Sequence, residues 1–160
     1  MKVVTERPKA PEGYGYSTER KGMLEWETVR DAVAAAKLYW IGTTRPDGAP
    51  HLHPIWGGWV GYHLYFEGGE TTKWARNLAA DARVSFGVES NGLHISGRGV
   101  VERGAAGDDF AALVANYGGK YDYKPQDDLF FKVLPEVVLA LNMSSMAEFA
   151  SSPTRFRFEK

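Results

Sequence analysis

Two hydroxyl groups and two cations lie close together in the segment Thr71-Thr72-Lys73-Trp74-Ala75-Arg76. Gly68-Gly69 before it is typical of a strand end, and either threonine can cap a helix that we expect to run to about Ala80. The first turn of a helix exposes unpaired N–H groups and the positive end of the helix dipole, which favour a phosphate. The segment therefore predicts either an anion site or simply a capped helix with solvated basic residues.

Two histidines lie two residues apart in His51-Leu52-His53-Pro54-Ile55-Trp56. In a strand, alternate residues share a face, so His51, His53 and Ile55 point one way while Leu52, Pro54 and Trp56 point the other. A pair of histidines fills only half of a tetrahedral metal site, and the chain has no Cys and only two further His. We expect no metal, and we interpret both histidines as hydrogen-bonding groups at a pocket wall or a subunit interface.

The sequence contains no motif that assigns a catalytic side chain. Gly97-Arg98-Gly99 is not followed by the third glycine of a dinucleotide-binding loop, and it predicts a bend or bulge in a strand. No nucleophile elbow, P-loop or zinc-protease motif is present. Tyr117, Tyr121 and Tyr123 are as readily packing residues as substrate contacts.

The composition indicates one globular domain. The 160 residues are 44% hydrophobic with a net charge of −1, and no charge run predicts nucleic-acid or membrane binding. The first 22 residues lack the apolar core of a signal peptide, so we expect a cytoplasmic protein. Aromatic residues reach 13%, which favours a ring-lined pocket or a subunit interface.

The elements predict a mainly β (α+β) fold in which six to seven antiparallel strands form a split β-barrel with connecting helices. A loose arm is expected over residues 1–22, followed by one domain over 23–160. Asn91-Gly92 is a strong hairpin signal. The expected strands are residues 38–44, 49–56, 63–67, 83–88, 93–103, 137–142 and 154–158. The expected helices are residues 25–37, 71–80, 108–117 and a short segment near 127–132.

The order of four sequence blocks resembles the pyridoxamine-phosphate-oxidase-like FMN-binding split barrels, and within them the branch with the deazaflavin-dependent reductases. The blocks are Trp40 to His51 with its Arg45-Pro46-Asp47-Gly48 turn, Pro54-Ile55-Trp56-Gly57 with Leu64-Tyr65-Phe66, the stretch from Thr72 to Val84, and Pro153 to Phe158. The resemblance covers roughly residues 24–159.

The resemblance implies a homodimer that holds FMN, or alternatively the deazaflavin coenzyme F-420, at the subunit interface. It places the cofactor ring along the strand His53, Pro54, Ile55 and Trp56, with Phe66 and Glu67 beside it. Thr72 and Lys73 would hold the phosphate, with Arg76 in support. These positions coincide with the anion site expected from the helix start.

The resemblance implies an oxidoreductase that moves a hydride between the bound ring and a small organic substrate. His53 stands where the flavin oxidases carry an arginine, and the C-terminal Arg and His set for pyridoxal phosphate is missing. Both departures argue against true pyridoxamine-phosphate oxidase activity. The alternative is a split barrel that carries a flavin or a haem without turnover.

Overall fold

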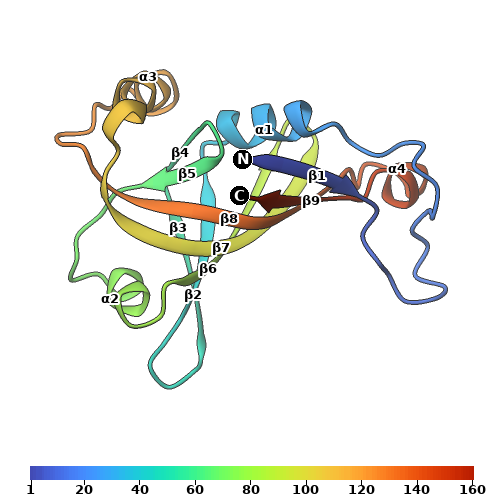
Figure 1. Ribbon diagram of the computed structural model, residues 1–160, viewed down its shortest axis with the longest axis horizontal. Coiled ribbons are helices and arrows are strands. Elements are labelled where there is room, and N and C mark those ends of the chain that lie inside the picture. The colour runs from blue at the N-terminus through green and yellow to red at the C-terminus, as the bar shows by residue number, and fades with distance from the viewer.

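The computed structural model describes residues 1–160 and contains nine strands, four α-helices and one short 3₁₀ turn (Figure 1). The strands are β1 (Lys2–Glu6), β2 (Tyr39–Thr44), β3 (Pro50–Ile55), β4 (Gly58–Val60), β5 (His63–Phe66), β6 (Arg83–Ser90), β7 (Leu93–Ala105), β8 (Leu129–Leu141) and β9 (Thr154–Glu159). The helices are α1 (Trp26–Ala35), α2 (Lys73–Ala80), α3 (Phe110–Tyr121) and α4 (Met146–Ser151). No helix has the length and apolar character needed to cross a membrane.

All strand pairs are antiparallel, and the sheet runs in the order β1-β9-β8-β7-β6-β2-β3. The 13-residue strand β8 changes partner along its length, because Phe131 to Val133 pair with β5 and Val137 to Ala140 pair with β9. β4 pairs only with β5. The sheet therefore curves into a split barrel that is open between β3 and β4, and the predicted fold class is confirmed.

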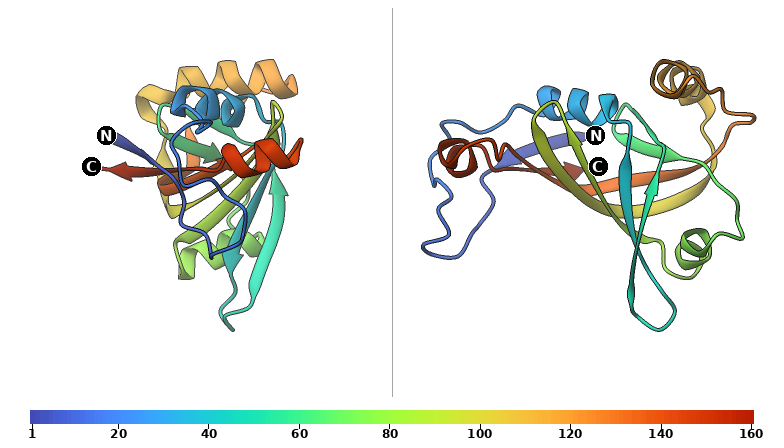
Figure 2. Two further views of the ribbon diagram at one scale, coloured as in Figure 1. Left: turned by 90° about the vertical axis from the view of Figure 1, so that its right-hand side faces the viewer. Right: turned by 180° about the vertical axis from the view of Figure 1, so that it is seen from behind.

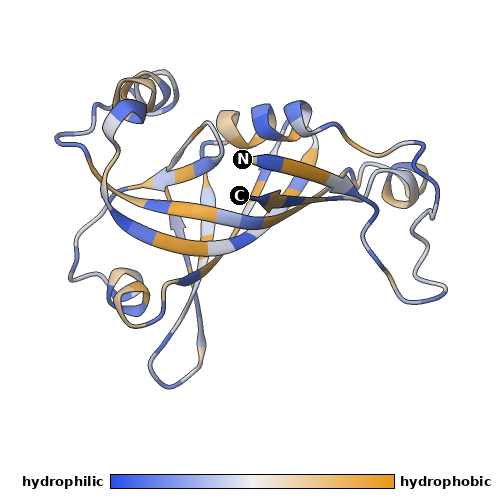
Figure 3. Ribbon diagram, in the orientation of Figure 1, coloured by the Kyte–Doolittle hydropathy of each residue, from blue (hydrophilic) through white to orange (hydrophobic).

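The core lies between the curved sheet and α1. Trp26, Val29 and Val33 form the buried stripe of α1, which packs against β4, β6 and β7. β7 and β8 carry apolar stretches (Figure 3), and Ile95, Val133 and Val138 on them are buried in this core. A second, smaller cluster lies beneath α3 and consists of Tyr65, Leu113, Tyr117 and Phe130.

The expected bulge and hairpin are confirmed. The pairing of β7 with β8 shifts register between Arg98 and Gly99, and a Cβ at Gly99 would come within 2.1 Å of the Leu134 carbonyl oxygen. The hairpin turn has positive φ at both Asn91 (51°) and Gly92 (75°), as its sequence requires.

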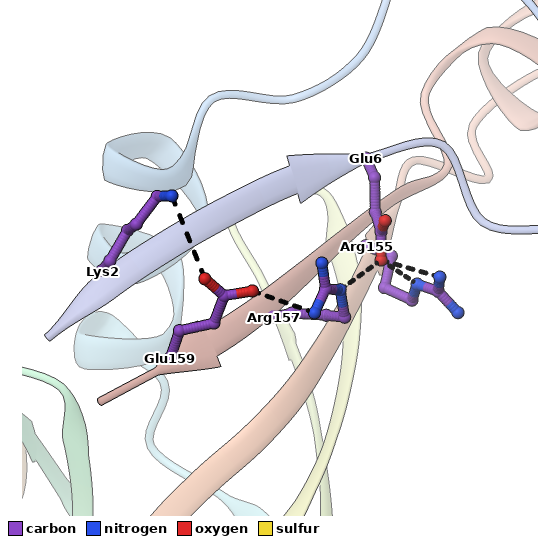
Figure 4. A network of polar contacts seen from close by, with 5 residues as sticks. All are labelled: Lys2, Glu6, Arg155, Arg157 and Glu159. Carbon is purple, nitrogen blue, oxygen red and sulfur yellow. Dashed lines mark hydrogen bonds and ion pairs between the residues drawn. The ribbon is translucent and has the colours of Figure 1, made fainter.

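The expectation of a loose arm over residues 1–22 is corrected at its beginning. β1 pairs with β9 along its whole length, and Glu6 accepts bonds from Arg155 Nε at 2.7 Å and Arg157 Nε at 2.8 Å (Figure 4). The β-branched residues of this segment suit a strand, but the partner lies about 150 residues away in the sequence. Beyond it, Arg7 donates to the carbonyls of Ser151 and Pro153, each at 2.7 Å, and residues 8–24 loop past α4 (Figure 2).

Three further elements differ from the expectation. The segment expected to be helical near residues 127–132 is the start of β8, because Phe130 and Phe131 are buried by strand pairing. β4 lies in the connection between the expected strands 49–56 and 63–67, and α4 was not predicted. Only the start of β8 depends on contacts distant in sequence. β4 forms a local hairpin with β5, and the Ser145 hydroxyl caps α4 by accepting from the Glu148 N–H, so both have local signals that the sequence reading missed.

Candidate functional site

A cleft of about 410 Å³ lies at the edge of the barrel, where the end of β3, the end of β5 and the start of α2 meet. Five of the nine residues expected to bind a cofactor line this cleft. The lining residues are His53, Ile55, Trp56, Glu67, Gly68, Thr72, Trp74, Tyr117 and Tyr123. The structure therefore brings together two strands and a helix start that lie far apart in the sequence.

The start of α2 is capped by Thr72. Its hydroxyl accepts from the Ala75 N–H at 3.3 Å and donates to the Gly69 carbonyl at 2.8 Å. The Arg76 N–H bonds to the Thr72 carbonyl at 3.0 Å. The N–H groups of Lys73 and Trp74 precede the first bond of the helix, so they remain available to an acceptor.

Trp74 anchors this turn, because its buried ring packs on Phe66 and Phe131 at centroid distances of 5.4 and 5.0 Å. The turn is therefore held rigidly at the mouth of the cleft.

The two cations of this helix have no carboxylate partner, whereas Arg45 on the neighbouring hairpin turn is paired with Asp47. Lys73 and Arg76 are exposed and form no salt bridge. Burial lowers the pKa of His51, and the positive charges of Lys73, His53 and Arg45 lower it further. The stacked rings of His51 and His53 lie 6.1 Å apart. A surplus of positive charge is thus concentrated at one mouth of the cleft.

The Nδ1 atom of His51 is buried and has no hydrogen-bond partner. An unpaired polar atom beside a positive cluster is a feature that an anion would satisfy. The two free amides of α2 and the exposed Lys73 and Arg76 beside them are groups that suit a phosphate.

Aromatic rings form the opposite wall of the cleft. The rings of Trp56 and Tyr121 stack at 4.5 Å with an angle of 7° between their planes, and the Tyr117 hydroxyl donates to the Trp56 carbonyl at 3.5 Å. The Glu67 carboxylate raises the pKa of Tyr123, and burial adds to this effect. Such a wall suits a planar ring, with Glu67 and Tyr123 as hydrogen-bonding groups at its edge.

The structure separates the other expected residues from the cleft. Phe66 is fully buried in the core, with its ring stacked on Phe131 at 5.5 Å, so it does not border the cleft. Pro54 is exposed and pairs with Trp40 across β2 and β3. Lys73 and Arg76 stand at the helix start but do not line the cleft.

The expectation for the cleft omitted Gly68, Trp74, Tyr117 and Tyr123. Sequence patterns identified both tyrosines only as undecided candidates, because the connection between α3 and β8 that carries Tyr123 has no regular period. No group of three or more His, Asp or Glu side chains is arranged to hold a metal ion.

The curved antiparallel sheet with a cleft at its open edge defines the class of split β-barrels. A family model described as pyridoxamine 5'-phosphate oxidase matches residues 26–142, which is most of the chain. The chain belongs to the pyridoxamine 5'-phosphate oxidase family.

Solved structures show the same fold at low sequence identity. A conserved hypothetical protein from Mycobacterium tuberculosis is 20% identical with a TM-score of 0.60, over 72% of this chain and 82% of that one. An F420 reductase is 23% identical with a TM-score of 0.55, over 81% of this chain and 98% of that one. A heme binding protein from Mycobacterium smegmatis is 21% identical with a TM-score of 0.60, over 79% of this chain and 60% of that one. Comparison with curated protein sequences gives no match.

Proposed function

We propose that this protein is an oxidoreductase that binds FMN or a deazaflavin cofactor and transfers a hydride between its ring and a small organic substrate. The observation that supports this proposal is the pairing of an unneutralised cationic helix start with an aromatic wall across one cleft. A phosphate-bearing planar cofactor has these two parts. The F420 reductase among the structural relatives is consistent with this assignment.

The residues of the cleft divide the binding between them. The free amides of α2 and the Lys73 ammonium would hold the phosphate, with His51 and His53 beside it and Arg76 in support. Ile55, Trp56, Tyr117 and Tyr123 would hold the ring and exclude water from it. The bound ring supplies the hydride chemistry, while the protein supplies orientation and electrostatics.

A proton that accompanies hydride transfer needs a donor close to the cleft. Because burial and the neighbouring cations lower the pKa of His51, its ring is neutral near neutral pH and would accept a proton rather than supply one. His53, which lines the cleft, is the remaining candidate donor. The place of these two histidines on β3 puts both beside the expected phosphate.

A carrier without turnover is the second candidate. It is favoured by the heme binding protein among the structural relatives and by the unpaired Nδ1 of His51, since imidazole nitrogen is an axial ligand for haem iron. The carrier would hold a flavin or a haem without turnover, so the two candidates differ in behaviour and, in the case of a haem, also in ligand.

Mass spectrometry of the small molecule released from native protein, with a visible spectrum of the same sample, distinguishes the candidates. FMN or a deazaflavin whose absorbance is bleached by a reductant and restored by an electron acceptor supports the enzyme. A haem spectrum, or a flavin band that no acceptor restores, supports the carrier instead.

A further inference from the structure

Lys120, on the last turn of α3, carries an amine that none of the roles above uses. Its Nζ donates to three acceptors on three different elements: the Gly57 carbonyl at 2.5 Å, the Ala36 carbonyl at 2.8 Å and the Tyr39 hydroxyl at 3.1 Å. An ammonium group has three donors, so the charged form of Lys120 is fully bonded. The bonds join α3 to the end of α1, to β2 and to the link between β3 and β4.

No carboxylate compensates this charge. The titratable groups that face the amine are the phenols of Tyr39 and Tyr121, whose rings lie 4.9 and 5.1 Å from Nζ. The Tyr39 hydroxyl donates to the Val33 carbonyl, and burial raises its pKa far beyond the physiological range, so it stays neutral. Burial lowers the pKa of Lys120 to about 8.

The shortest of the three bonds goes to the carbonyl of Gly57, which is the residue after Trp56. The Tyr121 hydroxyl also bonds to both the N–H and the carbonyl of Gly57, each at 3.1 Å, while its ring stacks on Trp56. A Cβ at Gly57 would lie 3.1 Å from Leu64, Tyr39 and the Tyr65 carbonyl. The backbone beneath Trp56 is therefore clamped between α3 and the sheet.

We propose that Lys120 is a positioning residue of the cleft, whose charged amine fixes Gly57 and thereby the Trp56–Tyr121 stack, so that ligand affinity depends on the charge of Lys120. The clamp rests on contacts within the chain, and its effect on a flavin rests on the proposed function. A neutral amine keeps only two donors, so one of the three acceptors loses its bond when Lys120 gives up its proton.

Raising the pH through this titration has opposite effects on affinity and on stability. The affinity of the cleft falls above pH 8 as the clamp loosens. The free energy of unfolding contributed by Lys120 rises over the same interval, because the unfolded chain, with its ordinary lysine pKa near about 10.4, binds more protons than the folded one. A lysine with a merely structural role would raise the free energy of unfolding over this interval in the same way but leave the affinity unchanged.

The test uses the full chain, with FMN as the probe, between pH 7 and 9. The Trp56 indole N–H resonance, assigned with Trp56→Phe, is followed in the ligand-free protein, and FMN affinity is measured by fluorescence quenching. Lys120→Met removes the charge and the donors. Lys124→Met, an exposed lysine four residues further along the chain, is the matched control.

In the wild type and in Lys124→Met, we expect the Trp56 resonance to titrate with a midpoint of about 8. FMN affinity should fall about three- to tenfold between pH 7 and 9, up to the strength of one charge-assisted hydrogen bond. In Lys120→Met, neither the Trp56 resonance nor the FMN affinity should change with pH, and the affinity should be low at every pH.

A Trp56 resonance that does not move in the wild type, or that titrates equally in Lys120→Met, overturns the proposal. The wild-type titration decides the question even if Lys120→Met does not fold. If FMN binds at no pH while Trp56 still titrates through Lys120, the positioning role is supported and the flavin assignment fails.

Discussion

At the scale of single residues, the cleft owes its character to charge that the fold leaves unpaired. Six aspartates and glutamates elsewhere on the surface are paired with arginines, as at Asp81–Arg83 and Glu6–Arg155. Lys73 and Arg76 have no such partner. Positive charge without an internal partner is available to a ligand, and its removal has little effect on the folded chain.

Replacing Lys73 by alanine should weaken FMN binding about ten- to a hundredfold, because a charge-assisted bond to phosphate contributes about 1.5–3 kcal/mol. The free energy of unfolding of the ligand-free protein, measured with urea, should change by less than about 0.5 kcal/mol, since the side chain is exposed. Lys37→Ala, at an exposed lysine outside the cleft, is the control and should bind like the wild type. Equal losses in both variants would place the phosphate elsewhere.

His51 should make FMN binding depend on pH. Its pKa is lowered in the free protein by burial and by neighbouring cations, and a bound phosphate would raise that pKa again. Binding therefore takes up a proton, and the affinity advantage of the wild type over His51→Gln should grow about threefold or more as the pH falls from 7.5 to 5.5. Comparing the two proteins at each pH removes the titration of the phosphate itself.

The same shift has the opposite sign for folding. A histidine whose folded pKa lies below its unfolded value binds fewer protons when folded, so His51 lowers the free energy of unfolding as the pH falls below about 6.5. If FMN affinity and the free energy of unfolding depend on pH in the same way in the wild type and in His51→Gln, this ring does not face the ligand.

At the scale of elements, the long strands β7 and β8 set the curvature of the sheet. Their register shift lies at Gly99, opposite Pro135, which has no N–H to donate, and a Cβ at Gly99 would meet the Leu134 backbone. β8 can then turn from β9 to β5 along its length. This change of partner places the end of β5, and Glu67 after it, beside β3.

A side chain at Gly99 should be destabilising. The Cβ of Gly99→Ala would lie 2.1 Å from the Leu134 carbonyl oxygen and 2.9 Å from the Pro135 Cα, so the backbone must shift, at a cost of about 2–3 kcal/mol in the free energy of unfolding. Gly104→Ala, further along the same strand with no atom within 4 Å of the new Cβ, should stay within about 0.5 kcal/mol. Denaturant unfolding of the two variants checks this difference, and equal stabilities would contradict it.

At the scale of the whole molecule, one face of the sheet carries large apolar side chains in the open. Trp40 is 43% exposed and Leu52 is 65% exposed, and both border a groove of about 550 Å³ that also touches Pro8 and Lys9. Apolar side chains gathered on one face mark an interaction surface. On this ground we propose that the protein is the homodimer that the sequence resemblance implies.

Light scattering of a dilute sample should give about 35 kDa, twice the chain mass of 17.7 kDa. Leu52→Asp should shift this to the monomer without loss of folding, because an exposed leucine contributes little to the core. The control Met146→Asp, at a residue of α4 that is 78% exposed, should remain dimeric. A wild-type monomer that still binds cofactor would contradict the proposed assembly.

The sequence by itself determined the features that depend on neighbouring residues. The alternation of apolar residues from Arg83 to Val88, the Asn91-Gly92 turn and the Thr72 cap each have a local physical cause, and each is present in the structure. The order of sequence blocks also predicted the family, whose model matches residues 26–142.

Only the tertiary structure decided the features that depend on residues distant in sequence. β1 becomes a strand because β9 offers it an edge, and residues 129–132 become part of β8 because burial of Phe130 and Phe131 outweighs their local pattern. The same holds for the cleft: Phe66 turns into the core, whereas Tyr123 reaches Glu67 from a loop without any regular period. Charge and turn chemistry are local, but burial is a property of the packed molecule, so it could not be predicted from one segment at a time.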